Sequence, residues 1–146
     1  MTNLRKQFNK NGYIHLKNTI AVETINAVHD QINMILVQQL KILNAPIPET
    51  LEDRVLSLFN NSTARYKSFC SVLARLNSVW QLCLSPAVLQ SIEKLGLENS
   101  TIPTMPVFHI MGEKIKIKDG YYGISAHQDW TSMQGSLDSI VAWMPL

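Results

Sequence analysis

The sequence predicts an α+β protein in which a helical first two-thirds precedes a strand-like last third. Two patterns support this. In residues 21–96, apolar side chains recur every three or four positions, as they do on one face of a helix. After Pro103 and Pro106, apolar and polar residues alternate with a period of two, which is typical of a half-buried strand. The 146 residues are 46% hydrophobic and 16% charged, the composition of one globular domain.

The first predicted element is a short strand over residues 13–17, which follows the turn-forming pair Asn11-Gly12. A long amphipathic helix is expected over residues 21–43, where one apolar face runs from Val22 to Leu43. Proline lacks the backbone N–H that a helix needs, so this helix should end before Pro46.

Three further helices are expected before the strands begin. The first covers residues 49–59, with acidic residues in its first turn, where the helix dipole favours them. The second covers residues 66–83, an uninterrupted apolar stripe. The third covers residues 85–96, with Ser85 as N-cap, Pro86 in the first turn and Gly96 as C-cap.

The last third predicts about four strands. Residues 107–110 form an apolar run, and residues 114–118 alternate lysine with isoleucine. Asp119-Gly120 is a preferred two-residue hairpin turn, and the return strand would cover residues 121–127. The last strand is expected over residues 139–143.

Charge and targeting signals exclude several classes of partner. Thirteen Lys and Arg against eleven Asp and Glu leave a net charge of +2, too small to indicate a nucleic-acid or anionic-membrane partner. The longest aliphatic run, residues 34–37, is far shorter than a membrane span, and the polar start lacks a signal-peptide core. Cys70 and Cys83 have no CxxC spacing and are expected to be buried thiols. We therefore expect a soluble, cytoplasmic protein.

The tripeptide His127-Gln128-Asp129 is the pattern with the clearest chemical meaning. Residues two apart in an extended strand project to the same side, so the imidazole and the carboxylate would point together. With a second histidine they would form the two-histidine, one-carboxylate triad that binds iron(II) and leaves positions open for oxygen. His127 and Asp129 are therefore the candidate metal ligands. H-x-D alone is a weak signal, and its neighbours must supply the specificity.

Those neighbours run in a recognisable order along the chain. They are Phe8, Asn11-Gly12-Tyr13-Ile14, Ile124-Ser125-Ala126-His127-Gln128-Asp129-Trp130, Gln134-Gly135-Ser136 and Val141-Ala142-Trp143-Met144-Pro145-Leu146. This arrangement resembles the phytanoyl-CoA dioxygenase family of iron(II)- and 2-oxoglutarate-dependent oxygenases. The resemblance implies a jelly-roll barrel (a double-stranded β-helix), hydroxylation of a small organic substrate, and His127 and Asp129 as two of the three iron ligands.

Four residues near the implied metal are candidates for binding the co-substrate or the substrate. Gln128, Tyr121 and Tyr122 offer hydrogen-bonding groups, and Lys116 offers a cation for the carboxylates of 2-oxoglutarate. The alternative for Lys116 is that it shares one strand face with Lys114 and Lys118 and protects a sheet edge.

The family takes its third ligand, a histidine, and an arginine that pairs with 2-oxoglutarate from strands downstream of the H-x-D. No histidine or arginine follows Asp129, and of the earlier histidines only His109 lies in a predicted strand near the motif. A jelly roll also needs about eight strands. Residues 1–146 are therefore expected to be one partial domain that does not catalyse the reaction. Residues 1–102 would hold the helices, and residues 103–146 the first barrel strands.

Two alternatives remain open. The chain could be a non-catalytic helical interaction module that pairs with another protein. It could also be half of a barrel that a partner chain or a swapped copy completes.

Overall fold

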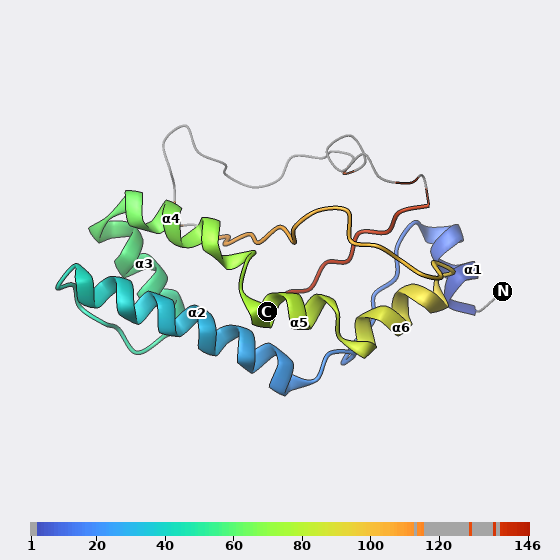
Figure 1. Ribbon diagram of the computed structural model, residues 1–146, viewed down its shortest axis with the longest axis horizontal. Coiled ribbons are helices and arrows are strands. Elements are labelled where there is room, and N and C mark those ends of the chain that lie inside the picture. Colours follow the sequence, from blue (N-terminus) through green and yellow to red (C-terminus); the bar gives the residue numbers. More distant parts are fainter. Residues whose placement is uncertain (1–2, 113, 116–128, 130–135, 137) are drawn as a thin grey trace.

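The computed structural model describes residues 3–112, 114–115, 129, 136 and 138–146. Six helices lie in this part of the chain: α1 (Asn3–Asn11), α2 (Val22–Ile42), α3 (Leu51–Asn61), α4 (Thr63–Leu73), α5 (Asn77–Cys83) and α6 (Pro86–Lys94). Figure 1 shows α2 as the longest helix, with α3 and α4 at one end of the molecule and α1 and α6 at the other. Helices α3, α4 and α5 all pack against α2.

The predicted α+β class and its jelly-roll strands are wrong for the described residues, which contain helices and no strand. Residues 13–17, 107–110 and 139–143 are not strands, and the described residues 114–115 belong to none. Residues 121–127 lie outside the described part. A strand requires a neighbouring backbone that completes its ladder of hydrogen bonds, and an alternating sequence does not supply that neighbour.

The turn signal at Asn11-Gly12 ends a helix and does not introduce a strand. Gly12 has φ of 76°, in the left-handed region that favours glycine, and its N–H donates to the carbonyl of Phe8 at 2.8 Å. This is the usual way in which a glycine just after a helix satisfies a carbonyl of the last turn. The residues before the turn are therefore α1, and residues 13–17 continue as an irregular segment.

Helix α2 confirms the predicted amphipathic helix to within one residue at each end. Its buried side chains, Val28, Ile32, Leu36 and Leu40, are four positions apart and therefore form one stripe. The stripe lies at the centre of a core cluster that also takes side chains from α3, α4 and α5. These are Val55, Leu58, Tyr66, Phe69, Leu73, Val79 and Leu82.

Helix α3 begins two residues after its predicted start, at a cap that the sequence pattern did not reveal. The Thr50 hydroxyl accepts a hydrogen bond from the backbone N–H of Asp53 at 3.1 Å and donates to the Asp53 carboxylate at 2.7 Å. The cap satisfies an amide that would otherwise lack a partner at the start of the helix.

The predicted helix over residues 66–83 is two helices, α4 and α5, separated by a turn at residues 74–76. Ser78, in the first turn of α5, is buried, and both its backbone N–H and its hydroxyl donate to Oε1 of Gln31, at 3.2 and 2.8 Å. Gln31 belongs to α2, so a distant side chain provides the acceptor that the start of α5 requires. The apolar stripe continues through the turn, which is why periodicity did not reveal it.

Helix α6 confirms the prediction that Ser85 precedes it and that Pro86 opens it. Ser85 makes no side-chain cap, however, and its Oγ is buried without a partner. The C-cap is Leu95, and Gly96 follows it with φ of 97°. A Cβ at position 96 would overlap the Arg5 side chain of α1, which lies over this turn.

Two elongated segments, residues 101–112 and 138–146, lie against the helices (Figure 1). Phe108 and Ile110 from the first segment and Met144 from the second pack on the core cluster. His109 and Trp143 stack on each other, which places the two segments side by side. They occupy the place in the sequence where barrel strands were expected, but they form a layer on a helical body.

Among the described residues, no single helix is both long and apolar enough to cross a membrane. One bent pair, α4 together with residues 77–94, passes that test by length and composition only.

Candidate functional site

The residues predicted to bind metal and co-substrate fall mostly outside the described part of the chain. The residues outside the described part are His127, Gln128, Tyr121, Tyr122 and Lys116. Asp129 is described: it is half-buried and lies in a turn. The pairing of His127 with Asp129 therefore stays a prediction from the sequence.

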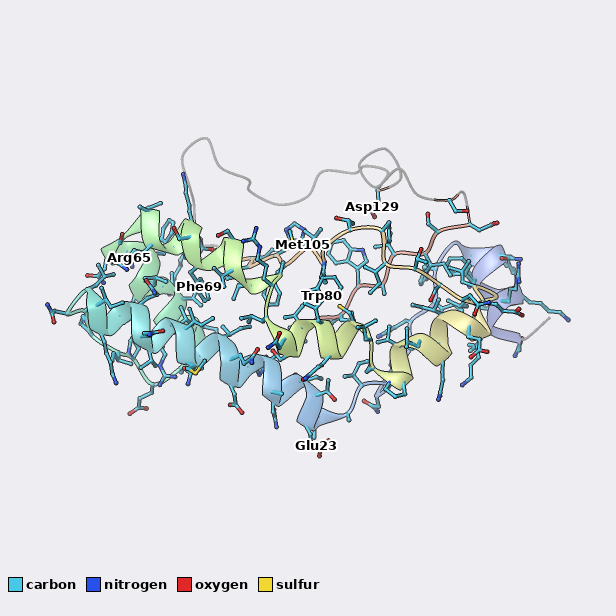
Figure 2. All side chains as sticks on the ribbon, viewed as in Figure 1. Glu23, Arg65, Phe69, Trp80, Met105 and Asp129 are labelled. Carbon is cyan, nitrogen blue, oxygen red and sulfur yellow. The ribbon has the colours of Figure 1, made fainter. Side chains whose placement is uncertain are left out.

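Asp129 lies on the same side of the molecule as the segment that carries Met105 (Figure 2). Glu23, at the start of α2, lies on the opposite side. The candidate metal ligand is thus on the side of the molecule where the two elongated segments cover the helices.

Among the described residues, the histidines upstream of the motif belong to no group of metal-binding side chains. His15 is exposed, and His29 is half-buried on α2. The His109 ring is stacked on the Trp143 indole, with centroids 6.2 Å apart and planes 13° from parallel. Within the described ranges, no group of three or more His, Cys, Asp or Glu side chains is arranged to hold a metal ion.

The segment of residues 105–111 has two distinct sides. Pro106, Phe108 and Ile110 are half-buried toward the helices, whereas the residues between them are exposed. We use the term outer face for the exposed side of this segment together with the Trp143 ring that stacks on His109. The outer face consists of Met105, Val107, His109, Met111 and Trp143. The sequence pattern placed Val107, His109 and Trp143 in barrel strands and did not reveal this surface, although the alternation that produces it is visible in the sequence.

A groove of about 740 Å³ lies between the first turns of α2, helix α5 and the start of α6. Its lining includes Glu23, Asn77, Trp80 and Leu84. Glu23 is the only carboxylate among the lining side chains. Polar side chains also line it, namely Thr24, Ser78, Gln81 and Ser85, whose buried Oγ has no hydrogen-bond partner.

Among the described residues, the pKa is raised for the buried Tyr66 and for the half-buried Cys70 and Cys83. Burial raises the pKa of both thiols, and burial followed by the Cys70 contact raises the pKa of the Tyr66 hydroxyl. Thiols with raised pKa values form little thiolate at neutral pH and react slowly. Both cysteines are free and half-buried, so the expectation that they are buried, unpaired thiols holds in part.

These raised pKa values predict that the protein loses stability in alkaline solution. The unfolded chain ionises its thiols near their ordinary pKa of 9.0, whereas the folded chain retains the protons. The free energy of unfolding therefore keeps its full value below pH 9 and declines as the pH rises through the pKa values of the thiols in the folded chain. Urea unfolding at about pH 7, 9 and 10 should show this fall, and Cys83→Ala should make it shallower. A free energy of unfolding that stays constant or rises above pH 9 would contradict this.

Comparisons with family models, curated proteins and solved structures give no match for this chain. The resemblance to the phytanoyl-CoA dioxygenase family therefore rests on the residues of the His127-Gln128-Asp129 region and their order. Any function assigned to the chain through that resemblance depends on the chemistry of the same residues.

Proposed function

We propose that this chain supplies two ligands, His127 and Asp129, to the iron(II) centre of a 2-oxoglutarate-dependent oxygenase that hydroxylates a small organic substrate. The observation that carries the proposal is the sequence His127-Gln128-Asp129-Trp130 in its context. The proposal depends on this motif and its chemistry and does not require a barrel.

The donor set fits the metal on chemical grounds. A neutral imidazole nitrogen and a carboxylate oxygen are the ligand types of the iron(II) triad, and a third ligand would complete it. The bound metal and 2-oxoglutarate would supply the oxidation of a carbon–hydrogen bond by dioxygen. Asp129 contributes the negative charge that offsets the metal, and its half-buried position reduces the screening of that charge by water.

The proposal also assigns the residues around the motif to the co-substrate. The ammonium of Lys116 would pair with a carboxylate of 2-oxoglutarate, and such charge-assisted bonds are stronger than neutral ones. The hydroxyls of Tyr121 and Tyr122 and the amide of Gln128 would donate hydrogen bonds to the same anion or to the substrate.

The test is iron(II) binding to the purified chain without oxygen, measured by calorimetry for wild type, His127→Ala and His15→Ala. Removing a ligand should weaken binding at least about 10-fold, since even residues that only support ligands have effects of this size. His15 is exposed and far from the motif in sequence, so His15→Ala should bind as wild type does and serves as the matched control.

A second titration, with 2-oxoglutarate added to the iron-loaded chain, tests the co-substrate residues. Lys116→Ala should weaken 2-oxoglutarate binding and leave iron binding unchanged. Far-UV circular dichroism of every variant establishes that the helices are intact. Wild-type chain that binds no iron(II), or His127→Ala that binds it with wild-type affinity, would overturn the proposal.

A further inference from the structure

The groove between the first turns of α2, helix α5 and the start of α6 has the size of a small-molecule site. Its volume of about 740 Å³ lies within the range of about 300 to 1,000 Å³ that such sites usually have. Figure 1 shows the three elements beside one another. The apolar part of the lining comes from all three, namely Ala27, Trp80, Leu84 and Pro86. The groove therefore combines an aromatic ring with small and aliphatic groups, as binding sites commonly do.

The Ser85 hydroxyl is a group in this groove that requires a hydrogen-bond partner. Among the described residues, its Oγ is the only buried side-chain oxygen or nitrogen that has none. Serine at this position normally accepts from an N–H of the first helical turn, but Ser85 makes no such cap on α6. Buried hydroxyls in native proteins are nearly always bonded, because an unmade bond is costly. Ser85 lines the groove, and rotation about its single side-chain torsion can turn the hydroxyl to a molecule bound there.

Helix α5 contributes two amides and an indole to the same groove. Asn77 and Gln81 are four positions apart and exposed, and Trp80 lies three positions after Asn77, so the three side chains share one face of the helix. An amide both donates and accepts hydrogen bonds, and an indole offers a flat apolar surface. This face therefore suits a ligand that has hydroxyl groups at its edge and an apolar ring face.

The charge of the lining excludes anions and favours an uncharged ligand. The lining contains one carboxylate, Glu23, and no Lys, Arg or His. An anion would find no cation to pair with and would be repelled by Glu23. Glu23 is exposed, so water screens its charge and it would hold a cation only weakly.

We propose that this groove binds a free neutral saccharide, whose ring lies on the Trp80 indole and whose hydroxyls bond to Asn77, Gln81 and Ser85. A sugar hydroxyl donates and accepts, which matches the amides and the Ser85 hydroxyl, and the C–H face of a sugar ring packs on an aromatic ring. The inference is independent of the iron site, because it uses none of the proposed metal or co-substrate residues.

The experiment is saturation-transfer difference NMR of the purified chain with the methyl glycosides of glucose, galactose and mannose. At least one should bind with a dissociation constant on the order of 1 mM, the affinity expected of so small a ligand. The methyl glucuronide that corresponds to the bound sugar adds only a carboxylate and should bind at least about 5-fold more weakly. Glu23→Gln should reduce that difference. A chain that binds none of the three glycosides, or binds the glucuronide as well as the neutral sugar, would overturn the proposal.

Substitutions on α5 locate the site. Trp80→Ala should weaken binding at least about 10-fold, whereas Trp143→Ala, the same change on the outer face, should leave it unchanged. Gln81 is exposed, so Gln81→Ala should fold normally and weaken binding, and Gln90→Ala on α6 is its matched control. Binding by Gln81→Ala and Trp80→Ala with wild-type affinity would contradict the assignment.

Ser85→Ala separates a ligand-binding serine from a structural one. Removing a buried hydroxyl that has no partner should move the midpoint of urea unfolding of the free chain to a higher urea concentration. The same variant should bind the sugar at least about 5-fold more weakly, because the ligand loses a hydrogen bond. A lower urea midpoint together with unchanged sugar binding would show that Ser85 serves the fold and would remove it from the site.

Discussion

Leu36→Ala lowers the free energy of unfolding by about 3 kcal/mol, the expected cost of a leucine removed from a close-packed core. Leu36 is 0% exposed and lies in the middle of the apolar stripe of α2, the helix against which α3, α4 and α5 pack. Truncation removes apolar contacts and leaves a cavity that helices on several sides cannot all move to fill. Urea unfolding followed by circular dichroism measures the change.

Met34→Ala, two positions along the same helix, is the control for this prediction. Met34 is exposed, and alanine and methionine both favour helix, so the change should be within about 0.5 kcal/mol. Similar losses for Leu36→Ala and Met34→Ala would mean that the α2 stripe is not the centre of the core.

Gln31→Leu should cost about 2 kcal/mol, because it removes the acceptor for two donors of the buried Ser78. The backbone N–H and the hydroxyl of Ser78 would then be buried without partners at the start of α5. Gln38→Leu is the matched control, since Gln38 lies on the same helix and is exposed.

The double variant Gln31→Leu/Ser78→Ala separates the two donors. It removes the hydroxyl along with its acceptor and should be more stable than Gln31→Leu alone, although the backbone N–H still lacks a partner. Equal stabilities of Gln31→Leu and Gln38→Leu would show that Gln31 does not stabilise the start of α5.

Much of the helical fold could be predicted from the sequence. The long helix over residues 21–43 was predicted almost to its ends, because the positions of Val28, Ile32 and Leu36 report which face of a single helix is buried. The start of α6 was predicted from Pro86, whose ring fixes a local backbone angle. Helix α1 was missed because its nine residues are mostly polar and bury no residue completely.

The candidate site was predicted less completely. The candidate metal ligands, His127 and Asp129, were chosen by residue type and spacing, and only Asp129 lies among the described residues. The outer face was missed because the sequence shows that residues 105–111 alternate, but not which of the two sides is covered. That depends on where the segment docks, and here Phe108 and Ile110 pack on the helical core while Val107 and Met111 are exposed.

The sequence by itself determined which residues form helical faces and where glycine and proline end or begin a helix, because these preferences depend on neighbours a few positions away. The tertiary structure decided where the predicted helix over residues 66–83 divides into two helices. It also decided which conformation the alternating segments after it adopt. The acceptor for Ser78 at the start of α5 is Gln31, 47 positions away, which no local window of sequence contains. Residues 107–110 likewise lie on helices without forming a strand, because a strand needs a ladder of backbone hydrogen bonds, and among the described residues the adjacent segment 138–146 makes none with them.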